Sequence, residues 1–107
     1  MIISPISMPA IHSGIDLIEI GRIRQAVERY GERFLERVYT PQELAESRRR
    51  FDSLAAQFAA KEAVSKALGT GIGRVGWRDM EILHAPSGEP RLILYGAAQA
   101  RAQQLNI

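Results

Sequence analysis

One long stretch of helical pattern, from Ser53 to Leu68, limits most strongly what this chain can fold into. Asp52 stands just before it, where an acidic residue commonly starts a helix, and Gly69 stands just after it, where glycine commonly ends one. Apolar residues recur mostly three or four positions apart, as on one face of a helix. They are Leu54, Phe58, Ala59, Ala63 and Ala67. Because alanine side chains are small, we expect another part of the backbone to pack closely against this helix.

Shorter patterns in the rest of the chain predict further helices and strands. Thr40-Pro41-Gln42-Glu43 is typical of a helix start, with threonine as the N-cap, proline first and glutamate third. We expect a strand at 10–15, helices at 17–30, 40–50 and 97–105, and a hairpin of strands at 79–84 and 91–95. This order of elements predicts an α+β fold, with a small, mainly antiparallel sheet packed against the long helix.

Length and composition limit the class of protein. The 107 residues suit one domain, 1–107, of which we interpret residues 1–9 as an irregular leader. The sequence has no cysteine, which excludes disulfides, thiolate metal sites and a cysteine nucleophile. No apolar run reaches the roughly 20 residues that span a bilayer. We therefore expect a cytoplasmic protein with no membrane partner.

The basic residues leave one alternative function open. The formal net charge is only +2, which by itself does not predict a nucleic-acid partner. The run Arg48-Arg49-Arg50 suits phosphate or nucleic acid, and it equally suits the C-terminus of a helix, where the helix dipole favours cations. The alternative function is a non-catalytic, Arg-rich nucleic-acid-binding module. The small charge and the lack of a base-reading motif speak against it, and we expect no nucleic-acid partner.

Two acidic residues are candidates for chemistry. Only two of the fourteen basic residues are lysines, Lys61 and Lys66, and they stand on either side of Glu62. Glu62 either forms a surface pair with Lys66, worth about 0.3–0.5 kcal/mol, or meets a metal ion. Asp16 is either the N-cap of the following helix or a metal ligand at the end of the first strand. Because Mg²⁺ is typically held by one or two carboxylates plus substrate phosphates, both acids could serve it if the fold brings them together.

A glycine-rich segment, Gly69-Thr70-Gly71-Ile72-Gly73, follows the long helix. Glycines allow a ligand to approach the backbone closely, and successive N–H groups can bind an anion. The spacing is not that of a P-loop, and the segment follows a helix, whose C-terminal end repels phosphate. An ordinary helix end followed by a turn is the other explanation.

Taken in order, the motifs resemble those of holo-acyl-carrier-protein synthase, a family of phosphopantetheinyl transferases. The resemblance extends from about residue 14 to residue 96. The motifs that carry it are Gly14-Ile15-Asp16-Leu17-Ile18-Glu19-Ile20, Lys61-Glu62-Ala63-Val64-Ser65-Lys66-Ala67, Gly69-Thr70-Gly71-Ile72-Gly73 and Gly88-Glu89-Pro90. The resemblance implies the phosphopantetheinyl transferase fold. It also implies transfer of the phosphopantetheine arm of coenzyme A to a serine of apo acyl carrier protein, with Mg²⁺, in fatty acid biosynthesis.

The resemblance also implies roles for individual residues. Asp16 and Glu62 match the metal-binding carboxylates, and Glu62 and Lys66 match catalytic positions. Arg22 and Arg33 match basic positions that face the acidic carrier protein. The positions implied to line the coenzyme A cleft are Lys66, Gly69, Thr70, Gly71, Gly73, Gly88 and Pro90. The family implies a homotrimer with its clefts between neighbouring subunits.

The end of the chain departs from the family pattern. Members usually continue for another pair of strands, with a Ser-x-Ser/Thr-His segment near the coenzyme A site. This chain ends at Leu105-Asn106-Ile107. We therefore expect a sheet whose C-terminal strands are missing.

Overall fold

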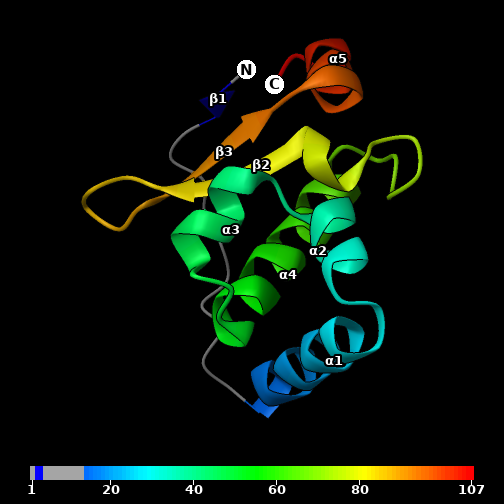
Figure 1. The fold of residues 1–107 in the computed structure, drawn as a ribbon. Coiled ribbons are helices and arrows are strands. Elements are labelled where there is room, and N and C mark those ends of the chain that lie inside the picture. The colour runs from blue at the N-terminus through cyan, green and yellow to red at the C-terminus, as the bar shows by residue number, and fades with distance from the viewer. Residues whose placement is uncertain (1, 4–13) are drawn as a thin grey trace.

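The computed structural model describes residues 2–3 and 14–107, with side chains described from residue 17 onward (Figure 1). The helical elements are α1 (Gly14–Tyr30), α2 (Glu32–Val38), α3 (Pro41–Ser47), α4 (Phe51–Ala67), the 3₁₀ helix η1 (Trp77–Asp79) and α5 (Gly96–Gln104). The strands are β1 (Ile2–Ile3), β2 (Met80–His84) and β3 (Pro90–Leu94).

The three strands form one antiparallel sheet in the order β1-β3-β2. In the β2–β3 hairpin, Ile82 lies opposite Leu92, and both side chains are buried. Ile2–Ile3 lie in the segment that we expected to be irregular. They pair as β1 with the outer edge of β3, an edge that offers unpaired backbone groups, and isoleucine suits such a strand.

Helix α4 is the central element of the fold. It lies between the sheet and α1, and it packs against both (Figure 1). The cluster on the sheet side consists of Ala60, Leu68, Val75, Met80, Ile82, Leu92, Leu94, Ala98 and Ala102. The cluster on the other side consists of Ile23, Leu35, Val38, Tyr39, Leu54 and Ala55. The predicted α+β fold, with a small antiparallel sheet packed against a long helix, is therefore confirmed.

The start of α1 differs from the sequence prediction. Gly14 and Ile15, expected at the end of a strand, are helical, and residues 10–13 of that predicted strand lie outside the described residues. Asp16 is consequently the third residue of α1, so its predicted role as N-cap is wrong. Each residue added to an existing helix gains one backbone hydrogen bond, and an acid in the first turn is favoured by the dipole.

The buried face of α4 also differs from the prediction. Ala63 and Ala67, which we assigned to the apolar face, are exposed. The buried residues of α4 are Leu54, Ala55, Gln57, Ala60, Lys61 and Ser65. Burial of a polar side chain is favoured where it finds partners, and distant parts of the chain supply them to Lys61 and to the side-chain nitrogen of Gln57.

The predicted start of α3 is confirmed in atomic detail. The Glu43 backbone N–H donates to Thr40 Oγ1 at 3.2 Å, and the Thr40 backbone N–H donates to Glu43 Oε1 at 2.9 Å. This reciprocal pair is a capping box. The helix ends at Ser47, earlier than expected, because Arg48 and Arg49 both adopt positive φ, at 54° and 58°.

A glycine at the junction of β3 and α5 yields a first testable prediction. Gly96 has a φ of +49°, and a Cβ added there would lie 3.2 Å from Asp79 Oδ1. Gly96→Ala should therefore lower the free energy of unfolding by about 1–2 kcal/mol. This corresponds to a fall of several degrees in the thermal midpoint, measured by circular dichroism.

Gly21 provides the matched control. It lies inside α1, and no described atom comes within 4 Å of an added Cβ, so Gly21→Ala should keep or raise the midpoint. Equal midpoints for the two alanine variants would contradict this account of Gly96.

Candidate functional site

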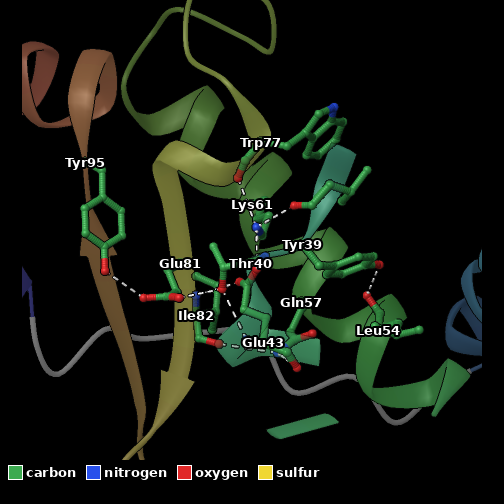
Figure 2. A network of polar contacts seen from close by, with 11 residues as sticks. Tyr39, Thr40, Glu43, Leu54, Gln57, Lys61, Trp77, Glu81, Ile82 and Tyr95 are labelled. Atoms are coloured by element: carbon green, nitrogen blue, oxygen red, sulfur yellow. Dashed lines mark hydrogen bonds and ion pairs between the residues drawn. The ribbon is translucent and has the colours of Figure 1, made fainter. Parts of the chain in front are cut away.

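A buried ion pair lies at the centre of the fold (Figure 2). Lys61 Nζ and Glu43 Oε1 are 2.7 Å apart, and both side chains are 0% exposed. Lys61 Nζ also donates to the backbone carbonyls of Val38, at 2.7 Å, and Trp77, at 2.9 Å. The ammonium has three donors, and all three are used.

The carboxylate of Glu43 is equally well supplied with partners. Besides Lys61, its Oε1 accepts from the Thr40 backbone N–H, and its Oε2 accepts from the Ile82 backbone N–H at 2.8 Å. Burial raises the pKa of Glu43 and lowers the pKa of Lys61, and the ion pair opposes both shifts. Breaking such a buried pair by removing one partner typically costs about 3–5 kcal/mol.

The polar network continues from the ion pair to the surface of the sheet (Figure 2). Thr40 Oγ1 donates to Glu81 Oε2 at 2.5 Å, and the hydroxyl of Tyr95 donates to Glu81 Oε1 at 2.8 Å. Glu81 is buried, whereas Tyr95 is 44% exposed. The hydrogen bond to Glu81 raises the pKa of Tyr95. The network thus joins α3 and α4 to β2 and to the residue that follows β3.

Sequence reasoning identified Glu43 as a helix-capping residue but missed its ion pair with Lys61. One signal was available in the sequence. Leu54, Lys61 and Leu68 stand seven residues apart, which puts the lysine in the same stripe as two buried leucines. A lysine in the middle of an apolar stripe needs a buried anion as its partner.

The next residue, Glu62, points away from this network. Successive residues turn by about 100° around a helix, so Glu62 and Lys66 lie within roughly 40° of each other and about 100–140° from Lys61. Glu62 is half-buried and Lys66 is exposed. Among the described residues, neither side chain forms an ion pair, so the predicted surface pair between them is absent there. Glu62 is therefore a partly desolvated carboxylate that meets no cation of the described part of the protein.

The second predicted metal ligand, Asp16, lies in the first turn of α1, the helix that packs against α4. Its side chain is outside the described part, so its convergence with Glu62 stays a prediction. From residue 17 onward, no three acidic or histidine side chains gather as in a cage made of protein ligands alone. An ion at Glu62 would therefore need oxygens from substrate or water, which is typical of Mg²⁺.

The glycine-rich loop at 69–73 is a helix end. The N–H of Gly69 donates to Lys66 O at 2.9 Å, and the N–H groups of Thr70 and Gly71 donate to Ser65 O at 3.3 Å. These N–H groups are occupied, so they do not form the anion-binding arrangement that we left open. Gly69 has a φ of +71°, as expected at a helix end.

The two glycine-containing segments of the predicted cleft are far apart within one chain. Gly88, with a φ of +88°, lies in the turn between β2 and β3, and Pro90 begins β3. Figure 1 shows this turn at the opposite end of the hairpin from the loop that contains Gly69 and Gly73. One chain therefore does not bring the two segments together.

The predicted carrier-facing arginines are both at the surface. The Arg22 side chain is 70% exposed and lies 3.4 Å from Glu19, and Arg33 is exposed on α2.

The Arg48–Arg50 run, by contrast, is partly neutralised. Arg49 pairs with Glu32, and Arg50 Nε lies 3.9 Å from Asp52 Oδ1. This pairing weakens the alternative of a nucleic-acid-binding surface.

An open groove of about 410 Å³ lies between α2 and α3 and contains no predicted site residue; its lining is Glu32, Glu36, Tyr39, Pro41, Leu44, Ala45, Arg49 and Arg78. None of the described helices combines the length and the apolarity needed to cross a bilayer.

Comparison with known proteins relates this arrangement to one family. A model of the 4′-phosphopantetheinyl transferase superfamily matches residues 13–106. A holo-acyl-carrier-protein synthase from Roseiflexus castenholzii is 48% identical over 103 residues, covering 91% of this chain and 76% of the relative. One from Methylobacterium sp. is 54% identical over 96 residues, covering 86% of this chain and 71% of the relative.

Solved structures agree with the sequence comparisons. The Helicobacter pylori holo-acyl-carrier-protein synthase in complex with coenzyme A matches with a TM-score of 0.74 and 36% identity, over 82% of this chain and 75% of that one. The acyl carrier protein synthase of Plasmodium yoelii with ADP bound matches with a TM-score of 0.69 and 33% identity, over 82% of this chain and 71% of that one.

The family model matches nearly all of the chain. The curated relatives are about half identical to it in sequence, and the solved structures have the same fold. The chain therefore belongs to the 4′-phosphopantetheinyl transferase superfamily, as an enzyme of the holo-acyl-carrier-protein synthase type.

Proposed function

We propose that this enzyme transfers the phosphopantetheine arm of coenzyme A to a serine of apo acyl carrier protein, with Mg²⁺, as a step of fatty acid biosynthesis. The curated relatives are named for holo-acyl-carrier-protein synthesis, and the similar Helicobacter pylori enzyme was solved with coenzyme A. The observation that carries the proposal is the half-buried carboxylate of Glu62, which has no cation partner among the described residues and shares a face of α4 with Lys66.

Asp16 and Glu62 are the residues that we assign to the metal. The described residues suit a hard cation, because Glu62 offers carboxylate oxygens that no protein cation occupies. Asp16 lies at the start of the helix that packs against α4. When bound, Mg²⁺ would neutralise charge on the phosphoryl oxygens of coenzyme A.

Lys66 adds a second positive charge at the same oxygens. Its ammonium is exposed and unpaired in the described part of the chain, so it is free to meet a phosphate. The serine oxygen of the carrier bonds to the phosphorus that bears pantetheine, and the proton of the serine hydroxyl passes to water. The bond from that phosphorus to the bridging oxygen of the pyrophosphate breaks, and adenosine 3′,5′-bisphosphate leaves. Lys66 holds the diphosphate in line for this exchange.

The coenzyme A cleft is proposed to lie between neighbouring subunits of a homotrimer. The predicted lining residues Gly69, Thr70, Gly71 and Gly73 lie at one end of the β2–β3 hairpin, and Gly88 and Pro90 lie at the other (Figure 1). Because these segments lie at opposite ends of the hairpin in one chain, we assign the two sides of the cleft to two adjacent chains. The exposed apolar side chains Ile72 and Tyr95 suit burial at such an interface.

The carrier protein is proposed to dock on α1 and the start of α2. Arg22 and Arg33 present exposed guanidinium groups that suit an acidic partner. Ile18 is 60% exposed and stands one helical turn before Arg22, so the same face offers apolar area as well.

Removing either proposed metal ligand tests the chemistry. Glu62→Gln and Asp16→Asn should each reduce the rate of transfer by about 100-fold or more, because an interaction with charge that develops in the transition state is lost. The measurement is the mass of apo carrier protein after incubation with coenzyme A and Mg²⁺, with and without a chelator. Glu36→Gln, which changes an exposed carboxylate of α2, is the matched control. Near-normal rates in both site variants would refute the metal assignment.

Charge reversal tests the docking surface. Arg22→Glu and Arg33→Glu should each raise the KM for the carrier protein roughly tenfold and weaken its dependence on salt, with the affinity for coenzyme A unchanged. Arg91→Glu, an exposed arginine of β3, is the control and should change neither parameter. An equal loss of coenzyme A affinity would show that the arginines serve another site.

A further inference from the structure

We propose that Lys61, through its ion pair with Glu43, is a positioning residue for the carboxylate of Glu62. Lys61 does not reach the surface, since its side chain is 0% exposed and all three of its donors are used inside the protein. It therefore acts only through the orientation of α4. The proposal rests on the proposed function, because it assumes that Glu62 binds the metal.

The contacts of Lys61 fix the rotation of α4 about its own axis. Its three acceptors belong to different segments: the end of α2 at Val38, the 3₁₀ helix at Trp77, and α3 at Glu43. Hydrogen bonds from an ammonium are stronger than those between neutral groups. Because the pair is inaccessible to solvent, water cannot replace a lost partner. Any rotation or shift of α4 would break several of these bonds together.

Glu43, the partner of Lys61, is itself held from two sides. Its carboxylate accepts from the Thr40 N–H in the capping box of α3 and from the Ile82 N–H in β2. Through Glu43, the position of Lys61 is therefore fixed relative to both the start of α3 and the sheet. The ion pair thereby relates the orientation of α4 to the rest of the fold.

The apolar contacts of α4 near Lys61 fix the rotation of the helix less precisely than the hydrogen bonds of Lys61 do. The neighbouring residues Ala59 and Ala60, half-buried and buried, have small side chains that interdigitate little. Larger contacts nearby are the stacking of Phe58 on Trp77, with ring centroids 4.6 Å apart, and the packing of Val64 against the sheet-side cluster. A buried polar network in which every donor and acceptor needs a partner allows only one rotation of the helix, whereas a surface of small alanine side chains allows several.

A small rotation would matter for the chemistry. Glu62 follows Lys61 in the chain, and the side-chain envelope of a helix has a radius of about 5–6 Å. Turning α4 by about 20° would thus move the Glu62 carboxylate by about 2 Å. Mg²⁺ demands near-ideal octahedral geometry, with ligands at about 2.0–2.1 Å, and misplacing a reacting group by about 1 Å can cost 100-fold in rate.

The test is the affinity of the enzyme for Mn²⁺ in the presence of coenzyme A, measured by electron paramagnetic resonance. The variant is the double substitution Lys61→Met with Glu43→Gln, which removes both charges, keeps the side-chain volumes and avoids an unpaired buried charge. We expect Mn²⁺ affinity to fall at least about tenfold and kcat to fall with it, with the KM for the carrier protein unchanged. The single variant Glu43→Gln keeps the Lys61 ammonium and its two bonds to backbone carbonyls but leaves that buried charge without its anion, so it should lose Mn²⁺ affinity as well.

Leu92→Ala is the matched control for a purely structural effect. Leu92 is a buried residue of β3 on the sheet side that forms none of the hydrogen bonds of Lys61 or Glu43, and its truncation costs about 2–5 kcal/mol of stability. Its Mn²⁺ affinity should equal that of the wild-type enzyme.

Three outcomes would overturn the proposal. Wild-type Mn²⁺ affinity in the folded double variant or in Glu43→Gln would do so directly. An equal loss of Mn²⁺ affinity in Leu92→Ala would also overturn it, because it would show that Lys61 affects the metal site only by stabilising the fold. Wild-type affinity in Glu62→Gln would instead overturn the proposed metal site itself, and the positioning role with it.

Discussion

A lysine and a glutamate without exposed surface meet at the centre of this protein, 2.7 Å apart. Taking two charges out of water is expensive, and the expense is offset only when every donor and acceptor has a partner. Here the partners come from α2, α3, η1 and β2. The pair is thus stable only when the helices and the sheet are assembled around it. In turn, the pair fixes the positions of these elements relative to one another.

Two sides of α4 have different roles, one in holding the fold together and the other in presenting charged groups. One side carries Lys61 and packs against the sheet and α3, where all polar groups of the ion pair are satisfied. The adjacent side carries Glu62 and Lys66, which have no ionic partner among the described residues. A helix that is held firmly on one side can present charged groups accurately on another, and this is what binding a diphosphate with a small divalent ion demands.

Local chemistry explains what could be predicted from the sequence. Thr40 and Glu43 are three residues apart, so their capping box depends on no distant segment, and the β2–β3 hairpin is equally local. The burial of Lys61 depends on carbonyls that arrive from Val38 and Trp77, 23 and 16 residues away, so only the fold reveals it.

The most direct test of this account is where a divalent ion binds. Crystals grown with coenzyme A and Mn²⁺ can be measured at a wavelength where manganese scatters anomalously. We expect one anomalous peak within bonding distance of the carboxylates of Asp16 and Glu62, with Lys61 still paired to Glu43. A manganese ion bound away from both carboxylates, or bound at Glu62 with the Lys61–Glu43 pair broken, would contradict the account.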